Sequence, residues 1–141
     1  MHKPIQIGDL TVTPLQTRDQ TGGCLELFEV TLPPHVGILF PHLHYNYDET
    51  ILGVDGITTW TVAGKQTQVG PGEQLLIPRG APHGFLNLHS QGARFLCIHT
   101  PGVLGLAYFD EIAKVMQETC PTDYAALGAI MTRYGIIPAH L

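Results

Sequence analysis

Charged side chains are scarce in this sequence. Asp, Glu, Lys and Arg make up 13% of the 141 residues, whereas soluble domains typically carry about 25%. The formal net charge is -5, and the seven lysines and arginines are scattered along the chain. Nucleic-acid binding needs clustered basic side chains, so we expect no nucleic-acid partner. The low charge predicts instead that a partner subunit covers part of the surface, and we expect a homodimer.

Long apolar runs and paired cysteines are also missing. No stretch approaches the ~20 apolar residues that a membrane-spanning helix needs, and MHKPIQIGDL lacks the apolar core of a signal peptide. We therefore expect a cytoplasmic protein without a membrane partner. Cys24, Cys97 and Cys120 are widely spaced and odd in number, a pattern that fits neither a disulfide framework nor a CxxC metal site. We expect Cys24 and Cys97 to be small buried residues.

Glycine and proline are frequent, and they divide the first hundred residues into short segments. Strand-like segments, many rich in β-branched or aromatic residues, lie between these turn signals: 11–17, 24–32, 36–40, 50–54, 57–63, 73–78, 83–89 and 93–100. With no helical pattern between them, they predict an antiparallel all-β sandwich or barrel. In 24–32, alternation places Leu25 and Leu27 on one side and Glu26 on the other.

The pattern changes after Pro101-Gly102. Residues 106–119 place apolar side chains at helical spacing. A second helical segment, 123–134, has Thr122 or Asp123 as its cap and ends at Gly135. The sequence thus predicts one domain, in which a β-barrel over 1–104 is followed by a helical tail, 105–141, packed on the barrel or on a partner subunit.

Two histidines stand one residue apart in PHLHYNYDET. His42 and His44 share one side of a strand if the segment is extended, and Glu49 follows five residues later. Burying imidazoles is costly unless they have partners. Taken alone, the pair fits either a metal site or two solvent-facing residues. We assign no role to four other histidines, at the termini or beside loops: His2, His35, His89 and His140.

The wider context of this pair resembles the two signature motifs of the cupin superfamily. The first runs from Gly37 to Gly56 as glycine, four residues, HxH, four residues, glutamate, six residues and glycine, one residue shorter before His42 than is usual. The second is GEQLLIPRGAPHGFLN, and fifteen residues separate it from the first. It matches at all five signature positions: Gly72, Pro78, Gly80, His83 and Asn87.

This resemblance implies a double-stranded β-helix, or jelly-roll, barrel with motifs at 37–56 and 72–87 and two C-terminal helices. It implies that His42, His44, Glu49 and His83 bind one divalent transition metal. Three imidazoles and one carboxylate suit Fe, Mn, Ni, Co, Cu or Zn, and six-coordination would leave two open positions. The alternative is a degenerate cupin that keeps the barrel without the metal. Asn87 is expected to close the barrel through hydrogen bonds.

Strand parity gives a weaker prediction of the substrate pocket. Side chains that share the parity of the ligands should face the metal, and these are Phe40, Ile51 and Phe85. They fit core filler equally well. By parity Tyr45, Tyr47 and Asp48 face away, unless the turn breaks the alternation. Arg79 is expected at the surface beside a turn, and neither Trp60 nor His99 has a predicted side.

Three functions remain open from the sequence. The site and the tail resemble small bacterial cupins related to quercetin dioxygenase, which implies a dioxygenase acting on a small aromatic or enolic substrate, with Glu49 as catalytic base. An isomerase or lyase acting on a small sugar or keto acid is the alternative, although the sequence shows no basic cluster for a phosphate. The third is a non-catalytic cupin that binds a small molecule.

Overall fold

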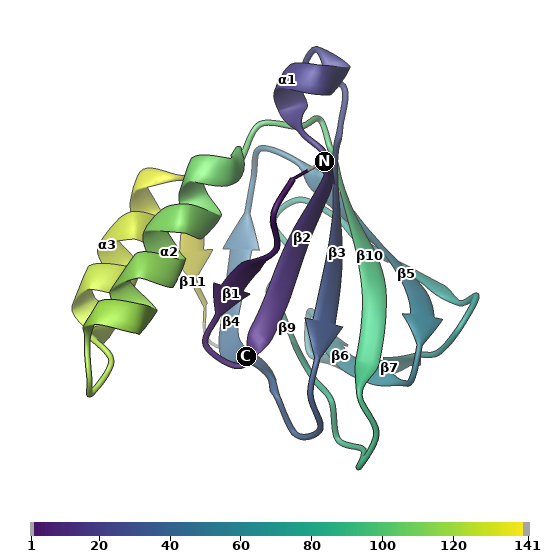
Figure 1. The fold of residues 1–141 in the computed structure, drawn as a ribbon. Coiled ribbons are helices and arrows are strands. Elements are labelled where there is room, and N and C mark those ends of the chain that lie inside the picture. Colours follow the sequence, from purple (N-terminus) through teal and green to yellow (C-terminus); the bar gives the residue numbers. More distant parts are fainter. Residues whose placement is uncertain (1, 140–141) are drawn as a thin grey trace.

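Two antiparallel β-sheets face each other and enclose the core (Figure 1). The structure is a computed structural model, and it describes residues 2–139. The six-stranded sheet has the order β1 (Ile5–Ile7), β2 (Leu10–Gln16), β3 (Glu26–Leu32), β10 (Ala93–Thr100), β5 (Asp48–Asp55) and β8 (Gln74–Ile77). The five-stranded sheet has the order β11 (Ile136–Pro138), β4 (Gly37–His44), β9 (His83–Leu86), β6 (Thr58–Val62) and β7 (Lys65–Val69). The predicted all-β jelly-roll is confirmed.

Alternating side chains of both sheets build the core between them. In β10, Phe95 and Cys97 face inward and are buried. Trp60 lies on β6 in the opposite sheet. The rings of Phe95 and Trp60 pack edge to face, with centroids 5.2 Å apart. Trp60 is 1% exposed, and its Nε1 donates a hydrogen bond to Thr58 Oγ1 over 2.8 Å. Burying such an aromatic side chain contributes about 2–3 kcal/mol, so this contact helps to fix the spacing of the two sheets.

Strand β4 bulges beside the site. Ile38 pairs with Phe85 and His42 pairs with His83, so four residues on β4 span the distance that two cover on β9. Two extra residues are therefore accommodated in β4, next to Pro41, which has no N–H to donate to the ladder. Phe40 lies in this bulge and is 60% exposed. The regular alternation on which its inward placement was predicted is interrupted here.

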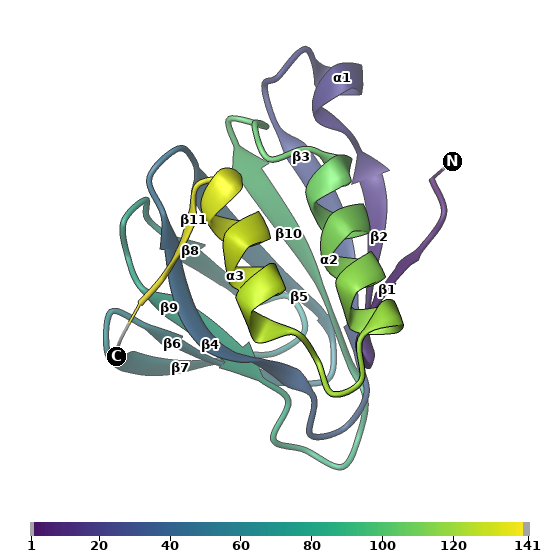
Figure 2. The same cartoon turned by 90° about the vertical axis from the view of Figure 1, so that its left-hand side faces the viewer.

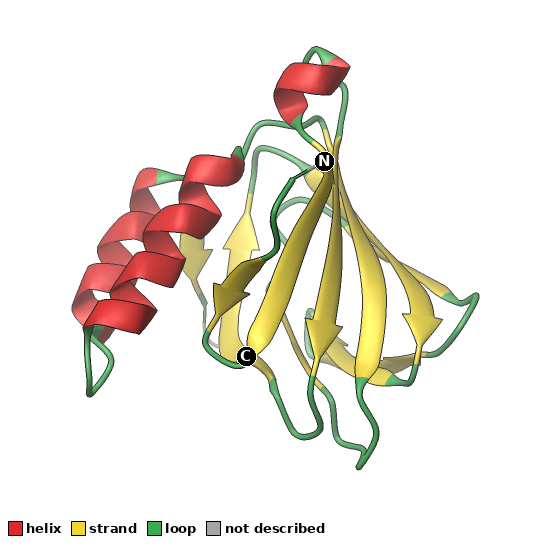
Figure 3. Cartoon of the chain, viewed as in Figure 1, coloured by secondary structure: helices red, strands yellow, loops and turns green. Residues whose placement is uncertain are grey.

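The C-terminal tail packs on the barrel of its own chain (Figures 2 and 3). Helices α2 (Leu106–Glu118) and α3 (Tyr124–Arg133) lie side by side along the barrel. Asp123 caps α3 by accepting a hydrogen bond from the backbone N–H of Ala126, as predicted. The tail then forms β11, which the sequence did not predict and which pairs with β4 from His42 to His44.

A few local features differ from the sequence-based expectations. A short helix, α1 (Arg18–Thr21), and the strands β1 and β7 were not predicted. Cys24 is exposed and not buried, because it lies in the loop after α1 and outside the sheet. Cys97 is buried, as expected. Among residues 2–139, no helix is long and apolar enough to cross a membrane.

Candidate metal centre

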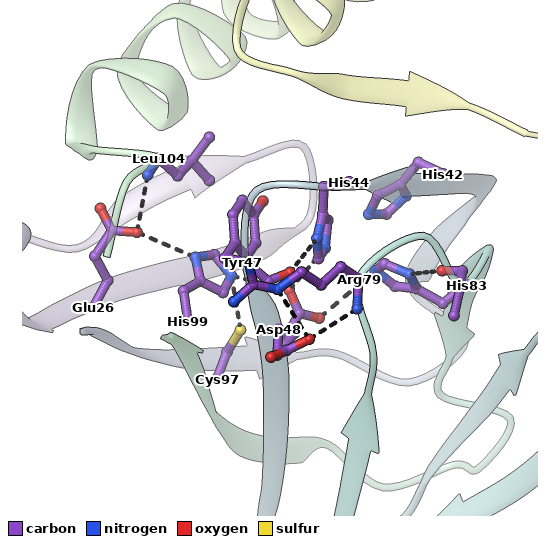
Figure 4. Close-up of polar contacts among 12 residues, drawn as sticks. Glu26, His42, His44, Tyr47, Asp48, Arg79, His83, Cys97, His99 and Leu104 are labelled. Atoms are coloured by element: carbon purple, nitrogen blue, oxygen red, sulfur yellow. Dashed lines mark hydrogen bonds and ion pairs between the residues drawn. The ribbon is translucent and has the colours of Figure 1, made fainter. Parts of the chain in front are cut away.

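Two histidines and one carboxylate converge inside the barrel. One ligand atom from each of His44, Glu49 and His83 lies within 4.8 Å of the others, and all three residues are buried. His44 Nε2 is 3.6 Å from Glu49 Oε1, and His83 Nε2 is 3.7 Å from Glu49 Oε2. Figure 4 shows the histidine rings turned toward this common space. The structure thus brings together three of the four predicted metal ligands.

The two sheets contribute from opposite sides. His44 ends β4 and His83 begins β9, both in the five-stranded sheet, whereas Glu49 lies on β5 of the six-stranded sheet. The turn before β9 holds the two histidine strands together, since the backbone N–H of Gly80 donates to His44 O over 2.8 Å. Gly80 has a φ of +79°, a conformation that glycine adopts readily. This contact places the turn at Pro78-Arg79-Gly80 where it can aim the strand that carries His83.

Hydrogen bonds fix which nitrogen of each ring is free. The Nδ1 atoms of His44 and His83 lie 3.1 Å and 2.9 Å from the carbonyl oxygens of Tyr47 and Ala81. A carbonyl only accepts, so each Nδ1 carries the proton and each Nε2 keeps its lone pair. Both Nε2 atoms are buried without a hydrogen-bond partner. Buried polar atoms are almost always satisfied, so these two lone pairs fit a metal ion, as does the Nδ1 bonding.

His42 lies beside this group. Its ring centroid is 4.5 Å from that of His83, and its Nδ1 is 3.1 Å from Phe40 O. Burial, together with the neighbouring His83, lowers the pKa of His42 to about 4. A neutral imidazole is the form that binds metals. Its ring nitrogens are outside the group that lies within 4.8 Å, so His42 is adjacent to the centre without completing it in this conformation.

The charge of the centre is set by Glu49. Burial alone would raise the pKa of its carboxyl, but the adjacent His44 and the hydrogen bond with His99 hold the pKa well below its usual range. Burial lowers the pKa of His83. The site therefore holds an ionised carboxylate and a neutral His83, the protonation states that a divalent cation requires. The same low pKa makes Glu49 a weaker base than an ordinary glutamate.

A buried polar row continues behind Glu49, and sequence reasoning missed it. Glu26, His99 and Glu49 are direct cross-strand partners on β3, β10 and β5. His99 Nδ1 is 3.2 Å from Glu26 Oε2, and His99 Nε2 is 2.9 Å from Glu49 Oε1. All three side chains are buried. The alternation in β10, which faces Phe95 and Cys97 inward, also places His99 inward and was the available signal. Glu26 lies on the side opposite Leu25 and Leu27, as predicted, and that side faces the core.

Tyr47 packs against two of these histidines. Its ring stacks on His44 with centroids 3.9 Å apart and lies 4.3 Å from His99. It is 2% exposed, because the turn between β4 and β5 breaks the alternation that would have placed it outside. Tyr45 and Asp48 follow the prediction: Tyr45 is 61% exposed, and Asp48 Oδ1 accepts from the backbone N–H of Arg79 on the barrel surface.

The predicted pocket residues lie in different places. The prediction that Phe40 faces the metal is wrong. Its ring contacts Tyr124 of α3 on the outside of the barrel, with centroids 5.5 Å apart. Ile51 is fully buried in the apolar core. Phe85 stacks on Trp60 with centroids 4.6 Å apart. Asn87 is fully buried and bonds Pro33 O, Gln91 O and the backbone N–H of His89, as expected of a residue that closes the barrel.

The centre lies within a segment that matches a known family. Residues 28–99, just over half of the chain, match the profile described as the cupin domain. The chain belongs to the cupin family. The resemblance drawn from the two motifs is thereby confirmed. The matched segment of this cupin includes His42, His44, Glu49, His83 and His99.

Solved structures agree with this assignment. The polyketide cyclase RemF from Streptomyces resistomycificus is 27% identical, with a TM-score of 0.62 over 70% of this cupin and 73% of that chain. KdgF from Halomonas sp. is 17% identical, with a TM-score of 0.63 over 71% of this cupin and 86% of that chain. A sugar phosphate isomerase of the cupin superfamily from Silicibacter pomeroyi is 23% identical, with a TM-score of 0.57 over 67% of this cupin and 60% of that chain. The last two show the fold alone. A comparison with curated proteins found no match.

Proposed function

We propose that this cupin is a metal-dependent dioxygenase acting on a small aromatic or enolic substrate. The observation that carries the proposal is the buried group of His44, His83 and Glu49, with two unpartnered Nε2 atoms. A set of two histidines and one carboxylate with open positions is typical of non-haem iron oxygenases. A metal held there supplies a positive charge that favours a deprotonated substrate hydroxyl, together with redox activity.

The residues around the centre support a substrate of low charge. Arg79, the one basic residue within the two motifs, pairs with Asp48, with its Nε 3.4 Å from Asp48 Oδ1. It is therefore engaged at the surface, which disfavours a sugar phosphate. Glu49 has a low pKa while His99 bonds it, so we assign it first to the metal. Its predicted role as catalytic base requires that this hydrogen bond be exchanged for one to the substrate.

Oxygen uptake tests the proposal. The protein is loaded separately with Fe, Mn, Ni, Co, Cu or Zn, and oxygen consumption is followed with a panel of flavonols and catechols. We expect consumption by the wild type and by the His89→Gln variant, whose histidine is exposed, and loss in His83→Gln. If no metal supports oxygen uptake with any phenol, the dioxygenase proposal is wrong.

A second candidate is a non-oxidative cyclase, and the likeness to RemF favours it. That protein is described as a polyketide cyclase and is 27% identical to this cupin. A cyclase would also use a metal to stabilise an enolate oxygen, but it needs no oxygen. Anaerobic incubation with a poly-β-carbonyl compound separates the candidates. A cyclised product formed without oxygen supports the cyclase, and an unchanged substrate rejects it.

A further inference from the structure

A second pair of ionisable residues lies directly behind the metal centre. His99 is held between two carboxylates, since its Nδ1 faces Glu26 at 3.2 Å and its Nε2 faces Glu49 at 2.9 Å. The ring is fixed from its sides as well, by Tyr47 and by Phe28, whose ring is steeply inclined to it with centroids 5.4 Å apart. Cys97 Sγ lies 3.4 Å from Nε2. The imidazole therefore has one orientation available to it.

Glu26 is anchored in turn by the segment that leads into the tail. Its carboxylate accepts hydrogen bonds from the backbone N–H groups of Leu104, at 3.3 Å, and Gly105, at 2.5 Å. Gly105 is the residue that precedes α2. The loop passes so close that a Cβ at Gly102 would lie 2.9 Å from Glu26 Cγ. Both carboxylate oxygens of Glu26 thus have hydrogen-bond partners, and these bonds fix the side chain against the start of α2.

A row of this kind is not explained by packing. Buried ionisable groups cost several kcal/mol each in desolvation, and apolar residues of similar size are often at least as stabilising. The neighbouring inward positions on the same strands, Phe28 and Cys97, are of that apolar kind. Within residues 2–139, this polar row lies where β3, β10 and β5 meet the candidate metal ligands. The row ends at the candidate ligand Glu49, and its hydrogen bonds are therefore best explained by a role in holding that carboxylate.

We propose that Glu26 and His99 are positioning residues that orient Glu49 for the metal. His99 holds Glu49 Oε1, and Oε2 is thereby directed to the side of His83, 3.7 Å from its Nε2. This inference rests on the proposed metal site. Partners of this kind behind a metal ligand typically change metal affinity by about 10- to 100-fold. Glu26 and His99 act through Glu49 and need not touch the metal or substrate.

Metal affinity of the whole chain tests the inference, with Co²⁺ as the probe. Glu26→Gln and His99→Gln keep the size and polarity of the row but break the fixed orientation. We expect each to weaken Co²⁺ binding about 10- to 100-fold in competition with a chromophoric chelator. The visible spectrum of the saturated Co²⁺ protein should also change. Glu29→Gln is the matched control, because Glu29 lies on β3 with the opposite parity and faces Arg94 at the surface.

The outcomes separate the inference from the proposed metal site. If the wild type itself fails to bind Co²⁺, the metal site is wrong. If the wild type binds and both variants match it in affinity and spectrum, even with a lower melting temperature, the positioning role is wrong. The double variant should lose no more affinity than either single one, because the two residues act as a unit. Should Glu26→Gln not fold, Glu26→Asp, which keeps the charge on a shorter side chain, is expected to weaken binding and change the spectrum in the same direction.

Discussion

Each of the three histidines predicted as metal ligands in this cupin is oriented by a backbone carbonyl. The Nδ1 atoms of His42, His44 and His83 all lie 2.9–3.1 Å from such oxygens, and their Nε2 atoms are thereby left as acceptors. The protein thus selects the tautomer that a metal ion would need. A ring that is free to rotate would lose conformational entropy on binding. The carbonyls that orient the rings lie two or three residues from each histidine in the chain.

Acid should destabilise the metal-free protein through His42. An unfolded histidine has a pKa of about 6.5, and the folded value is about 4. Between these values the unfolded chain binds more protons, so the free energy of unfolding should fall as the pH drops from about 6.5 to 4. Urea unfolding across this range measures the slope. His42→Asn should flatten it, and an unchanged slope in that variant would contradict the assignment.

Asn87 closes the barrel with three hydrogen bonds, and its loss should be costly. Asn87→Ala leaves Pro33 O, Gln91 O and His89 N–H without this partner. Leaving buried groups unsatisfied costs about 1–3 kcal/mol each, less where water can enter. We expect the free energy of unfolding in urea to fall by about 2 kcal/mol or more, against less than about 0.5 kcal/mol for Asn46→Ala at an exposed position. Equal effects would argue against this role.

At the scale of elements, β11 joins the tail to the strand that carries the histidines. Ile136 is 4% exposed and pairs with His44, whereas Ile137 is 41% exposed and pairs with Leu43. Ile136→Ala should therefore cost about 2–4 kcal/mol in urea unfolding. Ile137→Ala, on the same strand, should cost less than about 1 kcal/mol. The reverse order would mean that β11 does not pack as described.

Elements differ in how far the sequence predicted them. Regular alternation and turn signals were sufficient for most strands, and helical spacing with Asp123 was sufficient for α2 and α3. β11 was missed because three residues carry too little pattern. Phe40 was misplaced because the two extra residues of β4 change local geometry without a strong sequence signal beyond Pro41. Alternation fails wherever a bulge or turn intervenes.

The candidate site, like the fold, was predicted only in part from the sequence. The cupin motifs identified His44, Glu49 and His83, which the structure brings together. These motifs have a fixed spacing along the chain, so a single sequence is enough to recognise them. Glu26 and His99 belong to no motif, and their roles depend on the cross-strand register of β3, β10 and β5. Register is a long-range property that a single sequence does not specify. No side was predicted for His99, although the parity of Phe95 and Cys97 in β10 would have placed it inward.

For the whole molecule, the homodimer stays a prediction. Large apolar side chains are exposed on several elements: Phe40, Tyr45, Leu76, Leu88, Tyr124 and Ile137. Together with the low charge of 13%, they favour a covered surface. Sedimentation equilibrium at several protein concentrations measures the mass. We expect twice the mass of the 15.4 kDa chain, and a monomer at all concentrations would contradict the prediction.

Metal content tests the central claim most directly. The protein is purified, incubated with a divalent metal, freed of excess metal and measured by emission spectroscopy. We predict one metal ion per wild-type chain, retention in His89→Ala, and loss in His44→Ala and His83→Ala, because each removes one of the two unpartnered Nε2 atoms. Full metal retention by a folded His83→Ala variant would show that the metal does not bind at this centre.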